Sequence, residues 1–94
     1  MENKELTVND TKLTFAPLSL TSLNAQELKD ILIIKLTNCT HLMVDLKDIS
    51  EFDIAGLQII KGLENHSILN GLEFSISNIP EVVSTKLSIM GITL

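Results

Sequence analysis

The stretch of this 94-residue chain that most constrains its fold is "HLMVDL", residues 41–46. From Leu42 to Leu46 it is almost continuously apolar, and a helical pattern follows soon after. A strand that is apolar along its whole length is typical of the middle of a sheet with other elements packed on both faces. The sequence therefore predicts a central strand that is covered on both faces.

Alternating apolar residues predict further strands. Residues 6–8 and 13–15 alternate on either side of residues 9–10, Asn-Asp, which indicates a β-hairpin. Residues 72–77, "LEFSIS", alternate in the same way. The final "GITL", residues 91–94, is either a last edge strand or simply the end of the chain.

Helical spacing of apolar residues predicts three helices. Asn24, with Glu27 three residues later, resembles a capping box, so we expect the first helix to begin there. The second runs from Ile54 to about Asn70. Pro80 is well placed to open a third helix, over residues 81–89.

The resulting element order is β-β-α-β-α-β-α, with an optional last strand. Strand–helix–strand units use right-handed crossovers, so the later strands should be largely parallel, with helices packed against them. We therefore predict an α/β or α+β fold with a mixed sheet and about three helices. No repeat or linker divides the chain, so residues 1–94 are expected to form a single domain.

Charge argues against one class of partner. The chain has a formal net charge of −5, with twelve acidic residues, seven lysines and no arginine. Nucleic-acid binding relies on basic side chains that neutralise phosphates, and arginine is its commonest base reader. We therefore expect no nucleic-acid partner.

The sequence also predicts a compartment. Its one cysteine, Cys39, cannot form an internal disulfide, which fits a reducing environment. The first ten residues contain no apolar signal-peptide core, and the longest uninterrupted apolar run is Ile31 to Ile34, far below the roughly 20 residues of a membrane span. These features predict a cytoplasmic protein without direct membrane insertion.

Reactive side chains do not gather at any known catalytic or metal-binding spacing. His41 and His66 lie far apart in the sequence, and neither has a second ligand at metal-site spacing. Cys39 is expected to be a small, partly buried residue, and the glycines do not form a phosphate loop. The acidic run lacks calcium-loop spacing; its members are Asp45, Asp48, Glu51 and Asp53. We therefore predict no enzyme activity, no cofactor and no metal.

The junction "EFDIAGL", residues 51–57, is the most informative stretch for function. Asp53 is well suited to cap the second helix, because its carboxylate can accept the amide hydrogens of Ala55 or Gly56. The small Ala55 and Gly56 either let another molecule approach the backbone closely or allow tight internal packing. The residue pattern alone leaves both interpretations open.

The stretch "HLMVDLKDISEFDIAGLQII", residues 41–60, resembles the central signature of STAS domains, the family of the bacterial anti-sigma-factor antagonists. That signature is an apolar strand ending in Asp-Leu, a short loop, and Asp-Ser-Ser-Gly-Leu or a variant that opens a helix. The resemblance implies a STAS-like fold over nearly the whole chain. It also implies a protein-binding, regulatory role in bacterial signal transduction, with the partner contacting residues 53–57: Asp53, Ile54, Ala55, Gly56 and Leu57.

In the antagonists, a kinase that is also the anti-sigma factor phosphorylates a serine of this motif, and the phosphate abolishes binding. When Asp53 and Gly56 are aligned with the motif, Ile54 and Ala55 occupy the two serine positions, and Ala55 the phosphoacceptor position. Neither has a hydroxyl, so we expect no phosphorylation at the motif. Ser50, just before the helix, is the weak alternative acceptor.

The resemblance leaves the partner open. An anti-sigma-factor, kinase-like ATPase is the first candidate. Variants such as "DIAGL" also resemble the small STAS subunit that binds the ATPase of a lipid-transport ABC complex, and STAS proteins associated with chemotaxis. A nucleotide or small-molecule sensor is the alternative of a different class, and a ligand that raises the melting temperature would reveal it. A weak homodimer also remains open.

Overall fold

The computed structural model describes residues 5–89 and Gly91. The strands are β1 (Leu6–Asn9), β2 (Lys12–Phe15), β3 (Ser19–Leu20), β4 (His41–Asp45), β5 (Glu51–Phe52) and β6 (Glu73–Ser77). The helices are α1 (Ala25–Lys35), α2 (Ile54–Leu69) and α3 (Glu81–Ile89), and the 3-10 helix η1 (Leu36–Asn38) follows α1. This mixed α/β architecture confirms the predicted fold class.

The main sheet has the strand order β1-β2-β4-β6. β1 and β2 form the predicted antiparallel hairpin, and Asp10 in its turn has a left-handed φ of 58°. Polar Asn and Asp tolerate this conformation better than most residues, which explains the turn at this point. β2, β4 and β6 are mutually parallel, as expected for strands joined by helices.

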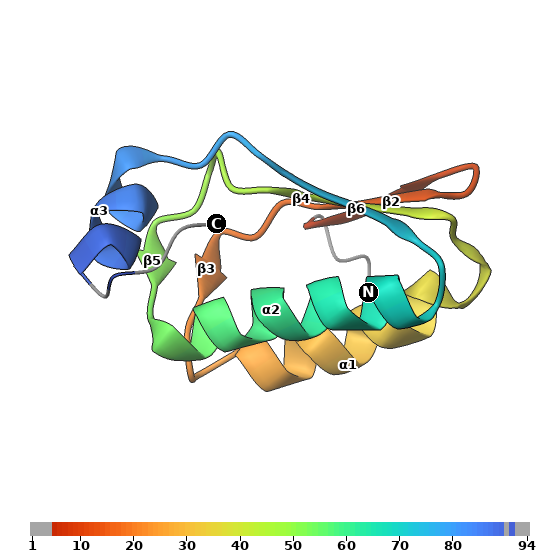
Figure 1. Cartoon of the computed structure of the whole chain (residues 1–94), viewed down its shortest axis with the longest axis horizontal. Coiled ribbons are helices and arrows are strands. Elements are labelled where there is room, and N and C mark those ends of the chain that lie inside the picture. The colour runs from red at the N-terminus through yellow and green to blue at the C-terminus, as the bar shows by residue number, and fades with distance from the viewer. Residues whose placement is uncertain (1–4, 90, 92–94) are drawn as a thin grey trace.

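The helices α1 and α2 lie side by side on one face of the sheet (Figure 1). The inward side chains Leu13, Phe15, Leu42 and Val44 are buried there. On the other face Met43, in the middle of β4, is 43% exposed. The predicted central position of β4 is confirmed, but the prediction that both of its faces are covered is wrong, because both crossover helices pack on the same side of the sheet.

A second, two-stranded parallel sheet joins β3 to β5 beyond one end of the main sheet, and α3 lies next to it (Figure 1). These two strands were not predicted from the sequence. They form the support for the start of α2. None of the described helices combines the length and hydropathy needed to cross a membrane.

The predicted helices at α1, α2 and α3 and the predicted strand at β6 are confirmed. The capping box at α1 is not: Asn24 makes no side-chain bond to a helix amide. Its Oδ1 instead accepts the N–H of Thr21 at 3.0 Å, and its Nδ2 donates to the carbonyl of Ser19 at 2.9 Å. Asn24 therefore stabilises the turn before the helix. Residues 92–94 of the predicted final strand are outside the described residues.

Candidate functional site

Asp53 fixes the first turn of α2. It has an extended backbone (φ −135°, ψ −173°), and its Oδ1 accepts the N–H of Ala55 at 2.9 Å and of Gly56 at 3.2 Å. These are helix-start donors that have no partner within the helix. The predicted cap is therefore present, and the helix begins at Ile54.

The second carboxylate oxygen ties this turn to a distant segment. Oδ2 of Asp53 accepts the N–H of Ser22, 31 residues earlier in the chain, at 3.1 Å. The Ser22 N–H is the main cause of a lowered Asp53 pKa; the N–H groups of Gly56 and Ala55 and the charge of Lys86 lower the pKa further, and desolvation opposes them. The carboxylate therefore holds the loop between β3 and α1 against the start of α2.

Backbone contacts of the small sheet position the same turn. The N–H of Asp53 donates to the carbonyl of Leu20 at 3.3 Å, and the N–H and hydroxyl of Ser50 both donate to the carbonyl of Leu18, at 2.8 and 3.0 Å. On the other side, Nζ of Lys86 on α3 donates to the carbonyl of Phe52 at 2.7 Å. The segment that leads into α2 is thus held from both sides.

Gly56 is a packing residue. A Cβ added there would lie 2.2 Å from the carbonyl oxygen of Leu20, far inside van der Waals contact. The close approach that this glycine allows is thus made by the chain's own strand β3. Gly56 and Leu57 are buried, so of the five predicted contact residues they belong to the core rather than to an exposed surface.

Ile54 and Ala55 form the accessible part of the motif. Ile54 is 51% exposed and Ala55 is half-buried. One large apolar residue near this turn was not predicted from the sequence: Leu23, which is 93% exposed, directly follows Ser22, whose N–H donates to Asp53. Its position becomes evident only from this long-range contact. We call Leu23, Ile54 and Ala55 the α2-start surface.

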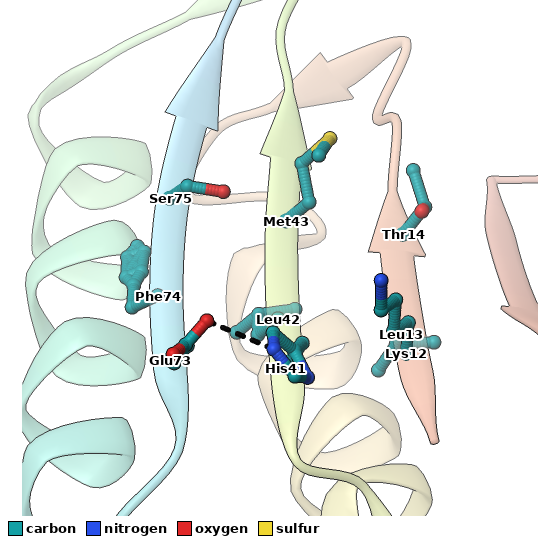
Figure 2. A pocket seen from close by; sticks show the side chains of 9 residues that line it. All are labelled: Lys12, Leu13, Thr14, His41, Leu42, Met43, Glu73, Phe74 and Ser75. Atoms are coloured by element: carbon teal, nitrogen blue, oxygen red, sulfur yellow. Dashed lines mark ion pairs between the residues drawn. The ribbon is translucent and has the colours of Figure 1, made fainter. Parts of the chain in front are cut away.

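The other singled-out residues do not converge on this surface. His41 and Glu73 form an ion pair of 2.8 Å on the open face of the main sheet, in a pocket that Met43 also lines (Figure 2). Cys39 is buried and its thiol donates to the carbonyl of Lys35. His66 lies near Asn70 at the far end of α2.

The acidic run also separates. Asp45 accepts bonds from the N–H of Lys47 and from the Asn78 side chain, whereas Asp53 caps α2. Within the described part of the chain, no three His, Cys, Asp or Glu side chains gather in a way that could hold a metal ion.

Comparison with known proteins gives one family. The family model described as "STAS domain" matches residues 8–93 of the chain. A search of curated proteins found no match. The matched region begins within β1 and includes every later strand and helix and the whole α2-start surface.

Proposed function

The chain belongs to the STAS domain family, and on that premise we propose that it is a non-catalytic regulatory module that binds a protein partner through the α2-start surface. STAS domains generally mediate protein–protein interactions and are generally non-catalytic. The family includes modules of the anti-sigma-factor-antagonist type. Our proposal adds the surface, the absence of the usual phosphate switch, and a role in bacterial signalling.

The observation that carries the proposal is exposed aliphatic surface on a fixed backbone. Leu23 and Ile54 expose large side chains from the two segments that the Asp53 carboxylate joins. A surface that is already rigid loses little conformational entropy on binding, which favours association. Burial of exposed aliphatic side chains in an interface supplies the driving force.

The same surface lacks the chemistry of the usual switch. Ala55 stands at the phosphoacceptor position and has no hydroxyl. The Ser50 hydroxyl, the weak alternative, is engaged with the Leu18 carbonyl, although the residue is exposed. We therefore propose that binding is not controlled by phosphorylation here. Mass spectrometry of the protein from its native cells should find no phosphate on residues 50–58; stoichiometric phosphoserine at Ser50 would contradict this.

Affinity capture from the native cells tests the docking surface. Wild type, Ile54→Asp and Ile34→Asp are compared by quantitative mass spectrometry. Ile34 is the matched control because it is an aliphatic residue on α1 that is 74% exposed, nine residues beyond the start of that helix. We expect a protein that wild type and Ile34→Asp enrich equally and that Ile54→Asp enriches at least tenfold less.

The identity of the captured protein distinguishes the partner classes: a kinase-like ATPase, an ABC ATPase or a chemotaxis protein. Equal enrichment by all three variants would contradict the proposed surface. Melting temperatures of both variants must stay close to that of wild type, so that loss of capture reports on the surface and not on unfolding.

A further inference from the structure

The two edges of the main sheet differ in how they are covered. At one edge, α2 runs alongside β6, and the inward side chains Phe74 and Ile76 are half-buried (Figure 2). At the other edge, Val8 of β1 pairs with Leu13, which is fully buried, yet Val8 itself is 52% exposed. The β1 edge is therefore the more open of the two.

The backbone register shows which groups of β1 face outward. The N–H of Ala16 donates to the carbonyl of Glu5 at 2.8 Å. In an antiparallel ladder hydrogen-bonded pairs alternate, so Thr7 and Asn9 also bond to β2. The N–H and C=O groups of Leu6 and Val8 then point away from β2. β1 is the last strand of the sheet, and no described residue pairs with this side.

This edge is complementary to itself. With a twofold axis at Thr7, the outward N–H and C=O groups of Leu6 face those of Val8 in the second copy, and those of Val8 face those of Leu6. These two pairs form four N–H···O bonds. An axis at Val8 would place Leu6 against Asp10, which has already left the strand with its φ of 58°. Among the described residues of β1, only a twofold axis at Thr7 lets all the outward N–H and C=O groups of Leu6 and Val8 form hydrogen bonds.

The side chains agree with this register. Leu6 and Val8 lie on the helix side of the sheet, so the pairing brings four aliphatic side chains together, and Thr7 meets Thr7 on the open face. Glu5 would lie opposite Asn9, so no like charges are apposed. The strand "LTVN" also carries neither lysine nor proline, the residues that commonly protect a sheet edge from pairing.

We infer that β1 is a docking site for a second copy of this chain, which pairs antiparallel about Thr7 and makes one continuous eight-stranded sheet. The contact is only four residues long in each copy, so the area that it buries is below the roughly 1,200 Å² of stable specific interfaces. The dimer is therefore weak. The net charge of −5 per chain opposes association, and salt therefore strengthens it. This inference goes beyond the proposed function and involves a different surface.

Disulfide trapping tests the register. In a Cys39→Ala background, Thr7→Cys places two thiols at a non-hydrogen-bonded antiparallel pair, where the Cα atoms lie about 4.5 Å apart, within disulfide range. Thr14→Cys on β2 and Ser75→Cys on β6 are matched controls on the same open face. Under mild oxidation we expect Thr7→Cys to form dimers at least tenfold faster than either control. Equal rates would overturn the inference.

Sedimentation tests the unmodified protein. Wild type should show a concentration-dependent monomer–dimer equilibrium, and Val8→Lys should be monomeric with an unchanged melting temperature. Wild type that stays monomeric at millimolar concentration would overturn the inference. Because Val8→Lys leaves the α2-start surface intact, it should still capture the protein partner, which separates a failure of this inference from a failure of the proposed function.

Discussion

Two glycines on α2 lie in regions with opposite demands. Gly56, in the first turn, has the Leu20 carbonyl at 2.2 Å from the position that a Cβ would occupy. Gly62, near the middle of the helix, would bring a Cβ to 3.6 Å from the end of the Lys29 side chain, which is an ordinary contact with a flexible group. One glycine is required by a backbone contact between elements, and the other only weakens the helix.

The residues at the start of α2 are divided between internal packing and an accessible surface. The face of the first turn that carries Gly56 is used for packing against β3, and that packing holds the turn in place. The side of the turn with the exposed Ile54 and the half-buried Ala55 is left accessible. A single turn of helix thus joins the core to the proposed docking surface. The following variants test this division, from the largest expected effect to the smallest.

Gly56→Ala should cause the largest loss of stability. Alanine favours a helix interior over glycine by about 1 kcal/mol, but the new methyl group meets a backbone carbonyl that cannot move aside freely. We expect the clash to prevail and to destabilise the fold at or above the upper end of the roughly 1–3 kcal/mol typical of overpacking. Chemical denaturation measures it. Wild-type stability in this variant would show that β3 does not press on the helix start.

Asp53→Asn should cause a smaller loss that depends on pH. Asparagine retains an acceptor oxygen but loses the charge that faces three N–H groups and Lys86. The folded-state pKa of Asp53 is lowered from 3.8, so its stabilising contribution is complete above that value and disappears as the pH falls through the lowered pKa.

Denaturant midpoints of wild type and Asp53→Asn should therefore differ at about pH 7 and converge as the pH falls below 3.8 and through the lowered pKa of Asp53. A difference that stays constant over this range would mean that the charge of Asp53 does not stabilise the helix start. Ser50→Ala, which removes a neighbouring side-chain bond to the Leu18 carbonyl without any charge, serves as a control that should show no such convergence.

Gly62→Ala should have the smallest effect on stability, with the opposite sign. The added methyl group finds only the flexible end of Lys29, so helix propensity decides, and the fold should gain about 0.5–1 kcal/mol. Chemical denaturation of Gly62→Ala and Gly56→Ala, measured together, gives the sign of each stability change directly. A loss at both positions would remove the distinction between the two regions.

Much of the fold could be predicted from sequence because its elements follow regular periodicities. The hairpin, β4, β6 and the three helices all carry an apolar repeat. β3 and β5 could not be predicted, since a two-residue strand shows no period and its partner lies about 30 residues away. The exposure of Met43 was hidden for a related reason: an apolar residue does not reveal which face of a sheet the helices leave uncovered.

The site was predictable in position but not in detail. The Asp53 cap follows from local helix chemistry, and the structure confirms it. The second bond of its carboxylate, to Ser22, depends on a loop brought near by the fold. For the same reason the sequence could not separate the buried Gly56 from the accessible Ala55, or indicate Leu23 as their neighbour.

The central claim is that the accessible half of the first α2 turn binds a protein partner. Calorimetric titration of the captured partner against wild type, Ala55→Asp and Asn65→Asp tests it most directly. Asn65 is exposed near the far end of α2, so Asn65→Asp adds the same charge away from the α2-start surface. An unpaired carboxylate at Ala55 must be desolvated in the interface, which is costly.

We therefore predict that Ala55→Asp binds at least tenfold more weakly, a loss of about 1.4 kcal/mol or more, whereas Asn65→Asp binds like wild type and both variants keep their melting temperatures. Equal affinity of Ala55→Asp and wild type would contradict the claim.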